Sequence, residues 1–405
     1  MFARFIARRF LSHRHGSFTA PLVRIATYSI ALGVLVMTMS VSILRGFQKA
    51  ISDKVVGFGS HVLVKSYADA GLYEDPPLTI DPHETEAIQQ LDGVRRLQYY
   101  ATKGGMVKTD DAIHGIIYKG VSRDYDLTFF EDGMVKGRLP ELGDSTASTD
   151  VLVSQTIARK LSLDTGSKVR TYFWHGDSYR ARAFTVAGIY NTDLTEFDEH
   201  YMIGDLRQVQ RLNGWSTDQV GGYEILVKDF SKLDATAQEV SEVTNFDRSI
   251  TTVVDENPTL FSWLNLLDSN IVLILCVMAM VCVVSVISAL LIMIFEKTQM
   301  IGILKTLGAD NRTVQRIFLI KSAQITGTGI AVGTVIAVVL CVIQHVWRII
   351  RLDSESYSVG YVPVDLSPWI FIAVGVGTAI VCTAALLLPA AYISRVEPAK
   401  TIRLE

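Results

Sequence analysis

Hydrophobic residues are concentrated in four long stretches of this chain. Four windows of at least 20 residues lack any Asp, Glu, Lys or Arg. The hydrocarbon core of a bilayer needs about 20 apolar residues in a helix, and a buried helix of a soluble protein seldom reaches that length. We therefore predict a membrane protein with four transmembrane α-helices. The predicted spans are 23–45, 270–295, 322–347 and 367–390.

In the segment between the first and second spans, residues 46–265, hydrophobic and polar residues alternate in the pattern of a soluble domain. Its short alternating runs predict strands, and its longer periodic runs predict helices, so that we expect an inserted α+β domain. The middle, about 122–220, is β-rich and is interpreted as a subdomain inserted in an outer α/β frame. Expected strands are 61–65, 94–101, 151–154, 168–174, 184–190, 201–203, 222–227 and 249–254, with a hairpin of 105–109 and 112–121. Expected helices are 81–91, 155–163, 205–212 and 233–243.

The first span is interpreted as an anchor and not as a cleaved signal peptide. Its apolar stretch is too long, and no small-residue cleavage site follows Leu44. Before it, residues 1–20 place aromatic and aliphatic side chains at helical spacing among arginines, which predicts a cytoplasmic interfacial helix in contact with membrane lipid. An unstructured basic tail is the alternative.

The distribution of charged residues predicts how these segments are oriented across the membrane. Residues 46–265 carry 22 basic and 33 acidic side chains, whereas the rest of the chain carries 16 basic and 8 acidic ones. Because Lys and Arg are enriched in cytoplasmic loops, we expect both termini, the loop 296–321 and the tail 391–405 in the cytoplasm. The domain 46–265 and the loop 348–366 then face outward, on the other side of the membrane; the family resemblance given below implies that this side is the periplasm. Because the large domain 46–265 is acidic and only the rest of the chain is basic, the charge also argues against a nucleic-acid partner.

Motifs for catalysis are absent from the sequence. It contains no GxxxxGK[ST], HExxH, CxxC or GxSxG motif, and its histidines lack metal-ligand spacing. We therefore expect no enzyme activity, no cofactor and no metal site. The run Asp198–Glu199–His200 could form an acid/base or metal site, but an acidic solvated loop is the simpler interpretation. Apart from Arg24 and Arg45 at the ends of the first one, the spans contain no Asp, Glu, Lys or Arg, which suggests that energy for any transport comes from outside the bilayer.

The cytoplasmic segment after the second span is the most informative part of the chain. Its periodicity predicts a short helix that breaks at Gly308 and a new helix capped by Asp310. One apolar face is expected, formed by Met300, Ile301, Leu304 and Leu307. Such a ridge suits insertion into a groove of a partner protein, although an ordinary interfacial connector fits the same pattern.

This segment, EKTQMIGILKTLGA, resembles the signature after the second span of permeases in the FtsX/MacB superfamily of ABC transporters. Within that superfamily the chain is most similar to the LolC/LolE lipoprotein-releasing permeases. Three further stretches carry the resemblance: GMVKGRL with VLVSQTIARKLSLDTGSKV, YSVGYVPVDL, and LPAAYISRVEP.

The resemblance implies a subunit without its own ATPase activity, in an inner-membrane complex of two permease chains and two cytoplasmic ATPase subunits. Lipoprotein substrates would be held between the first and second spans of the two permeases, and the periplasmic domain would combine a Porter-like frame with a Sabre-like subdomain. Segment 296–309 would be the coupling helix that docks on the ATPase. Its docking residues would be Glu296, Lys297, Met300, Ile301, Gly302, Leu304, Lys305, Leu307, Gly308 and Ala309.

The chain departs from the family in one hairpin. One permease of such a pair carries a protruding proline-containing loop that recruits a periplasmic lipoprotein carrier, whereas Phe173–Ala183 here is short and lacks proline. Trp174 and Tyr179 remain candidates for a carrier contact, with a plain β-turn as the alternative. A MacB-like efflux permease and an FtsX-like regulator of cell-wall hydrolases are the other functions considered, and pairing with itself or with a paralogue stays open.

Overall fold

The computed structural model describes residues 19–68, 74–109, 112–143, 146–175, 178–353 and 357–392. The expected interfacial helix 1–20 and the tail 391–405 therefore lie almost entirely outside the described residues. The chain divides into two compact units. The first comprises Met1–Gln48, Trp263–Arg351 and Val362–Glu405, and the second comprises Lys49–Ser262 and Leu352–Tyr361.

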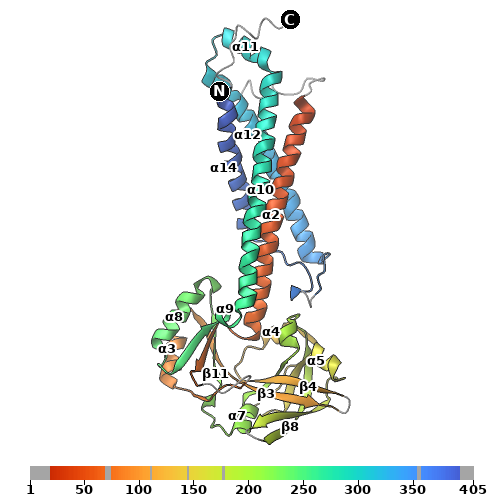
Figure 1. Cartoon of the computed structure of the whole chain (residues 1–405), viewed down its shortest axis with the longest axis vertical. Helices are drawn as coiled ribbons and strands as arrows, with labels where there is room; N and C mark the ends of the chain where they lie inside the picture. Colours follow the sequence, from red (N-terminus) through yellow and green to blue (C-terminus); the bar gives the residue numbers. More distant parts are fainter. Residues whose placement is uncertain are drawn as a thin grey trace. The chain divides into compact units, whose positions relative to one another are not determined.

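Four helices that are long and apolar enough to cross a membrane dominate the first unit (Figure 1). They are α2 (Thr19–Phe58), α10 (Pro258–Glu296), α12 (Asn311–Trp347) and α14 (Pro368–Tyr392). Both α2 and α10 continue beyond the apolar windows into the second unit, because a loss of apolar character does not by itself end helical hydrogen bonding. The helix α11 (Thr298–Thr306) joins α10 to α12.

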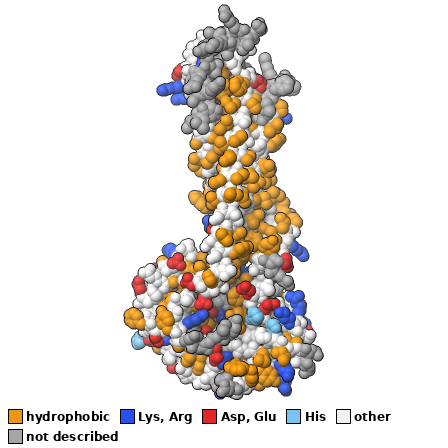
Figure 2. Space-filling view, in the orientation of Figure 1, with side chains coloured by type: hydrophobic (Ala, Val, Ile, Leu, Met, Phe, Trp, Pro, Cys, Tyr) orange, Lys and Arg blue, Asp and Glu red, His pale blue; other side chains and the backbone are white. Residues whose placement is uncertain are grey.

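Glycines set the spacing between these helices. A Cβ on Gly33 of α2 would lie 2.5 Å from Cys282 Sγ of α10. A Cβ on Gly329 of α12 would lie 2.8 Å from Ile30 Cγ2, and one on Gly333 would collide with the Ala31 carbonyl. These three glycines therefore permit close helix approach, because any larger side chain would collide with the neighbouring helix. Outside these contacts, apolar side chains cover the surface of the helices (Figure 2).

The second unit is built on a ten-stranded sheet with the order β12-β1-β11-β3-β4-β9-β6-β8-β5, and β7 pairs with both β3 and β8. Neighbouring strands are antiparallel except β4 with β9 and β6 with β8. A separate pair joins β2 (Leu78–Thr79) to β10 (Gln219–Val220). The strands of the main sheet are β1 (Val62–Ser66), β3 (Val94–Lys108), β4 (Ile113–Val121), β5 (Met134–Gly137), β6 (Asp150–Ser154), β7 (Lys168–His175), β8 (Ser178–Tyr190), β9 (Tyr201–Asp205), β11 (Gly222–Val227) and β12 (Arg248–Thr252).

Six of these strands close into a circuit. The pairings run from β3 to β4, β9, β6, β8 and β7, and β7 pairs back to β3. The rings of Tyr118, Phe173 and Phe184 pack together in its interior, with ring centroids 5.1–6.2 Å apart. Because β3 and β4 belong to this circuit, the β-rich part of the unit includes strands outside 122–220. The boundaries of an inserted subdomain therefore stay a prediction.

Short helices lie between the strands of the second unit. Two of them begin next to an aspartate at the expected position. Asp81 and Asp205 each accept a backbone hydrogen bond of 2.9 Å, from His83 and Arg207 respectively. The last expected strand ends early, because Thr252 and Asp255 form a capping box that begins α9. The helices are α3 (Pro82–Gln89), α4 (Thr128–Asp132), α5 (Gln155–Lys160), α6 (Thr195–Asp198), α7 (Leu206–Asn213), α8 (Leu233–Val243) and α9 (Val253–Glu256), with a 3-10 turn η1 (Phe230–Lys232).

Candidate functional site

The expected coupling segment is a helix with a well-defined end. Gly308 adopts φ +87°, a left-handed conformation that glycine accepts without steric cost. Its N–H donates to the Lys305 carbonyl, and the N–H of Ala309 donates to the Leu304 carbonyl at 2.9 Å. This pair of bonds is a Schellman motif, which ends α11 and separates it from α12. The predicted helix break at Gly308 is therefore confirmed.

The apolar side chains of α11 point in two directions and not one. Ile301 is fully buried and packs in the core of the first unit with Val314 and Phe318. Ile303 and Leu307, one helical turn apart, are 54% and 80% exposed. The expectation of a single face containing Ile301 was therefore wrong, because this helix uses Ile301 to pack on its own neighbours. The exposed pair Ile303 and Leu307 forms an apolar ridge, of which only Leu307 was predicted.

The other predicted docking residues differ in their exposure. Glu296 and Lys297 form an ion pair of 3.2 Å at the junction of α10 and α11. Gly302 is buried, while Met300 and Ala309 are half-buried against the core. Leu304 and Lys305 are half-buried, and Gly308 is exposed.

The hairpin of β7 and β8 presents an aromatic pair to solvent. Trp174 and Tyr179 face each other across the two strands, with ring centroids 4.7 Å apart and planes at 88°. Their side chains are 54% and 52% exposed. The two candidates for a carrier contact are therefore together on one accessible surface.

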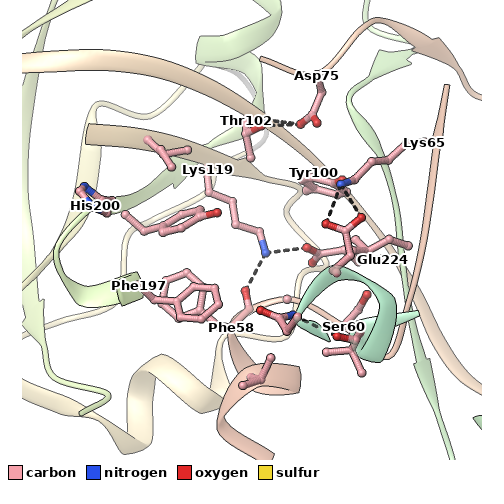
Figure 3. Close-up of a pocket in the computed structure, with 18 of the residues that line it drawn as sticks. Phe58, Ser60, Lys65, Asp75, Tyr100, Thr102, Lys119, Phe197, His200 and Glu224 are labelled. Carbon is pink, nitrogen blue, oxygen red and sulfur yellow. Dashed lines mark hydrogen bonds and ion pairs between the residues drawn. The ribbon is translucent and has the colours of Figure 1, made fainter. Parts of the chain in front are cut away.

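A cavity of about 500 Å³ lies in the second unit, beside the last residue of α2 and the residues that precede α10 (Figure 3). Its lining combines aromatic rings with ionisable groups. The lining includes Phe58, Leu63, Lys65, Glu74, Asp75, Tyr100, Thr102, Lys119, Phe197, Tyr201, Glu224, Glu256 and Asn257.

A buried ion pair stands at the centre of this lining. Lys119 Nζ of β4 donates to Glu224 Oε1 of β11 at 2.6 Å, to Tyr125 Oη at 2.9 Å and to the Phe58 carbonyl at 2.7 Å. Tyr125 in turn donates to the other Glu224 oxygen at 2.5 Å. Both charged side chains are at most 4% exposed. Since Phe58 ends α2, the Lys119 cation satisfies the last carbonyl of this helix and complements its dipole.

Burial dominates the electrostatics of the carboxyl groups in the lining. It raises the pKa of Glu224, although Lys119 and the hydroxyl of Tyr125 act in the opposite direction. Burial also raises the pKa of Asp75, against two hydrogen bonds that Asp75 accepts from the amide and hydroxyl of Thr102 at 2.7 and 2.6 Å.

Within the described residues, no three His, Cys, Asp or Glu side chains gather as a metal site. The run at 198–200 is not a solvated loop, because Asp198 is 2% exposed and accepts hydrogen bonds from the amide and hydroxyl of Thr192. Glu199 pairs with Lys160 at 2.9 Å, and His200 stacks on His114. This acidic run therefore closes a turn and brings no reacting groups together.

Lys119, Glu224 and Asp75 are site residues that were not predicted from the sequence. A signal for the first two was present, since each is a single charged residue inside a strand whose other side chains are mostly apolar. An ionised group in such a strand is costly to bury unless it is paired. The partner could not be read from the sequence, because the two residues are 105 positions apart.

Comparison with known proteins gives matches along nearly the whole chain. Residues 25–243 match the family described as MacB-like periplasmic core domain, and residues 272–398 match the FtsX-like permease C-terminal family. The lipoprotein-releasing system transmembrane protein LolC of Neisseria meningitidis serogroup B is 24% identical, over 99% of this chain and 98% of its own length. The LolE protein of Haemophilus influenzae is 23% identical, over 95% of this chain and 94% of its own length. The crystal structure of the periplasmic region of MacB from Actinobacillus actinomycetemcomitans covers 53% of this chain at 12% identity, with a TM-score of 0.35.

Proposed function

Because this chain belongs to the family of the MacB-like periplasmic core domain, with an FtsX-like C-terminal part of the LolC/LolE permease type, we propose that it is the permease subunit of a lipoprotein-releasing ABC transporter. In this proposal it resides in the bacterial inner membrane with both termini in the cytoplasm and the second unit in the periplasm. ATP hydrolysis in a separate subunit drives extraction of lipoproteins from the membrane toward the outer membrane.

The observation that carries this proposal is the match to LolC and LolE proteins over both units, and not over one domain alone. The absence of a GxxxxGK[ST] motif from the sequence fits a permease whose nucleotide is hydrolysed elsewhere.

Docking of the ATPase is assigned to α11. Two exposed apolar side chains one turn apart, Ile303 and Leu307, provide the anchors that a groove on a partner requires. The buried Ile301 holds α11 against α12, so that a force on the ridge reaches the helices of the first unit.

The substrate is assigned to the exposed apolar faces of α2 and α10. Ile25, Tyr28 and Leu32 project from α2 at helical spacing with 59–67% exposure. Along α10, Val272, Leu273 and Met280 are 59–67% exposed. Two permease chains facing each other across such surfaces would enclose acyl chains, whether the second chain is a copy or a paralogue.

Depletion of the protein, followed by fractionation of inner and outer membranes, tests the proposed function. We expect lipoproteins to accumulate in the inner membrane. Normal lipoprotein sorting with defective septation would instead identify a regulator of cell-wall hydrolases. Normal sorting with loss of export of a periplasmic compound would identify an efflux permease.

The docking assignment is tested by Leu307→Glu. A charge at the centre of the exposed ridge should abolish co-purification with the ATPase while leaving membrane insertion intact, because Leu307 makes little contact within this chain. Gln299→Glu is the matched control, since Gln299 is an exposed polar residue of the same helix and its substitution adds the same charge without removing an apolar anchor. Undiminished co-purification of the Leu307 variant would exclude the ridge as the docking surface.

A further inference from the structure

The lining of the cavity in the second unit includes none of the residues assigned above to ATPase docking or to holding acyl chains. One part of its lining is aromatic, with Phe58, Phe197 and Tyr201, and another part is acidic (Figure 3). Its volume of about 500 Å³ lies in the range of pockets that enclose a small ligand, so it has room for more than a single ion.

Most charges around the cavity already have partners. Lys119 pairs with Glu224, Lys65 pairs with Glu256 at 3.3 Å, and Glu74 pairs with the buried Lys103 at 2.5 Å.

Asp75 differs from these acids. Among the described residues it forms no ion pair, and both of its hydrogen bonds, from the amide and hydroxyl of Thr102, end on Oδ2. Its second oxygen, Oδ1, accepts no hydrogen bond within the described part of the chain. A carboxylate with one oxygen available beside a cavity is an acceptor for a cationic ligand.

A second group near Asp75 also lacks a partner. Tyr100 is 3% exposed, and within the described residues its hydroxyl makes no hydrogen bond. Burial raises the pKa of this hydroxyl, and the nearby Asp75, Glu224 and Glu256 raise it further, so that it stays protonated as a donor and acceptor. Leaving a buried hydroxyl unpaired costs about 1–3 kcal/mol, which a polar group entering the cavity would recover.

The position of the cavity identifies the occupant. Its lining includes Phe58, the last residue of α2, and also Glu256 and Asn257, which directly precede α10. In the proposed function the lipid anchor lies between α2 and α10, so the polypeptide attached to that anchor continues toward the ends of the same two helices.

We infer that the cavity binds a lysine or arginine side chain of the polypeptide segment that follows the lipid anchor of the substrate. This inference rests on the proposed function. The ammonium or guanidinium group is held by Asp75 Oδ1 in a charge-assisted ion pair, and the aliphatic stem of the side chain has the aromatic rings of the lining as apolar contacts. An acidic segment is disfavoured, since its charge would face the carboxylates of the lining.

Site-specific photo-crosslinking in the complete transporter tests this inference. A photoreactive amino acid replaces Leu63, a half-buried residue of the cavity lining, and the probe is one purified lipoprotein made with either Lys or Glu directly after its lipid-modified residue. The Lys form should crosslink about tenfold more, as expected for one charge-assisted contact. Asp75→Asn should reduce the Lys form to the level of the Glu form. Asp234→Asn, an exposed acid of α8 outside the lining, should change nothing.

A second photoreactive position at Val277, on the exposed face of α10, separates the two hypotheses. Crosslinking from Val277 together with equal yields of the Lys and Glu forms from Leu63 would overturn the basic-residue site and leave the transport function standing. Loss of crosslinking at both positions would overturn both. The comparison of the Lys and Glu probes uses the protein without the Asp75 substitution, so a folding defect of that variant cannot mimic the expected result.

Discussion

Replacing Lys119 by Met is expected to destabilise the second unit strongly. The substitution keeps most of the side-chain volume but removes a cation that donates three hydrogen bonds, to Glu224, Tyr125 and the Phe58 carbonyl. Glu224, which is 2% exposed, would remain as a buried carboxylate without a counter-charge.

The size of the expected loss in unfolding free energy follows from the burial of this ion pair. Removing one partner of a buried ion pair typically costs about 3–5 kcal/mol, because the other charge stays desolvated. For a domain of this size each kcal/mol corresponds to about 2–4 °C in the midpoint of unfolding, so the expected decrease is about 6–20 °C. The double variant Lys119→Met/Glu224→Met should recover most of this loss, since neither charge then remains.

The loss should also depend on pH. Burial already raises the pKa of Glu224, and removing Lys119 removes the main influence that lowers it. A carboxyl whose folded-state pKa lies above its unfolded-state pKa stabilises the fold at low pH, and that stability is lost as pH rises through the folded-state value. The single variant should therefore be closer to the parent protein at pH 5 than at pH 8.

Pulse proteolysis of the full-length protein in detergent, with fragments assigned to the second unit, measures this stability. The pair of single and double variants at pH 5 and pH 8 forms the complete experiment. A loss below about 1 kcal/mol for Lys119→Met, or a loss that is the same at both pH values, would refute the view that Glu224 depends on Lys119 for its charge.

Two further predictions concern packing. Gly333→Val should weaken the packing of α12 on α2, because its Cβ would collide with the Ala31 carbonyl. Gly327→Val is the control and should leave the packing unchanged, since a Cβ at Gly327 has no heavy atom within 4 Å. Thermal unfolding in detergent compares the two variants. Phe173→Ala should cost about 3–5 kcal/mol, because Phe173 is fully buried, whereas Trp174→Ala on the exposed side of the same strand should stay within about 0.5 kcal/mol in urea unfolding.

Elements whose signals are local could be predicted closely. The strand 222–227 and the helix 233–243 have the expected bounds, since their periodicities and turn residues lie within a few positions of each element. The four membrane helices followed from length and apolar character. The closure of the β circuit could not be predicted, because alternation shows that β3 and β7 are strands but does not show that they pair.

The candidate sites show the same difference between features with local signals, which could be predicted, and contacts between distant residues, which could not. Helical periodicity located α11 and its end at Gly308, but it could not say which side its own neighbours would cover, and so Ile301 was placed on the wrong face. Lys119 and Glu224 meet only through strands that are distant in sequence. Asp75 has no feature in the sequence that separates it from other acids of its domain.

The closed circuit of six strands limits how the second unit can be divided. Two of its strands, β3 and β4, precede residue 122, whereas the other four lie within 122–220. A protein made from 122–220 alone would leave β7 and β9 with open backbone edges where β3 and β4 now pair. Exposed edges of this kind template intermolecular pairing, so such a fragment would aggregate and not fold as a module. By the same argument, chimaeras between related permeases should exchange residues 94–220 together, because the hydrogen bonds that close the circuit then come from one parent.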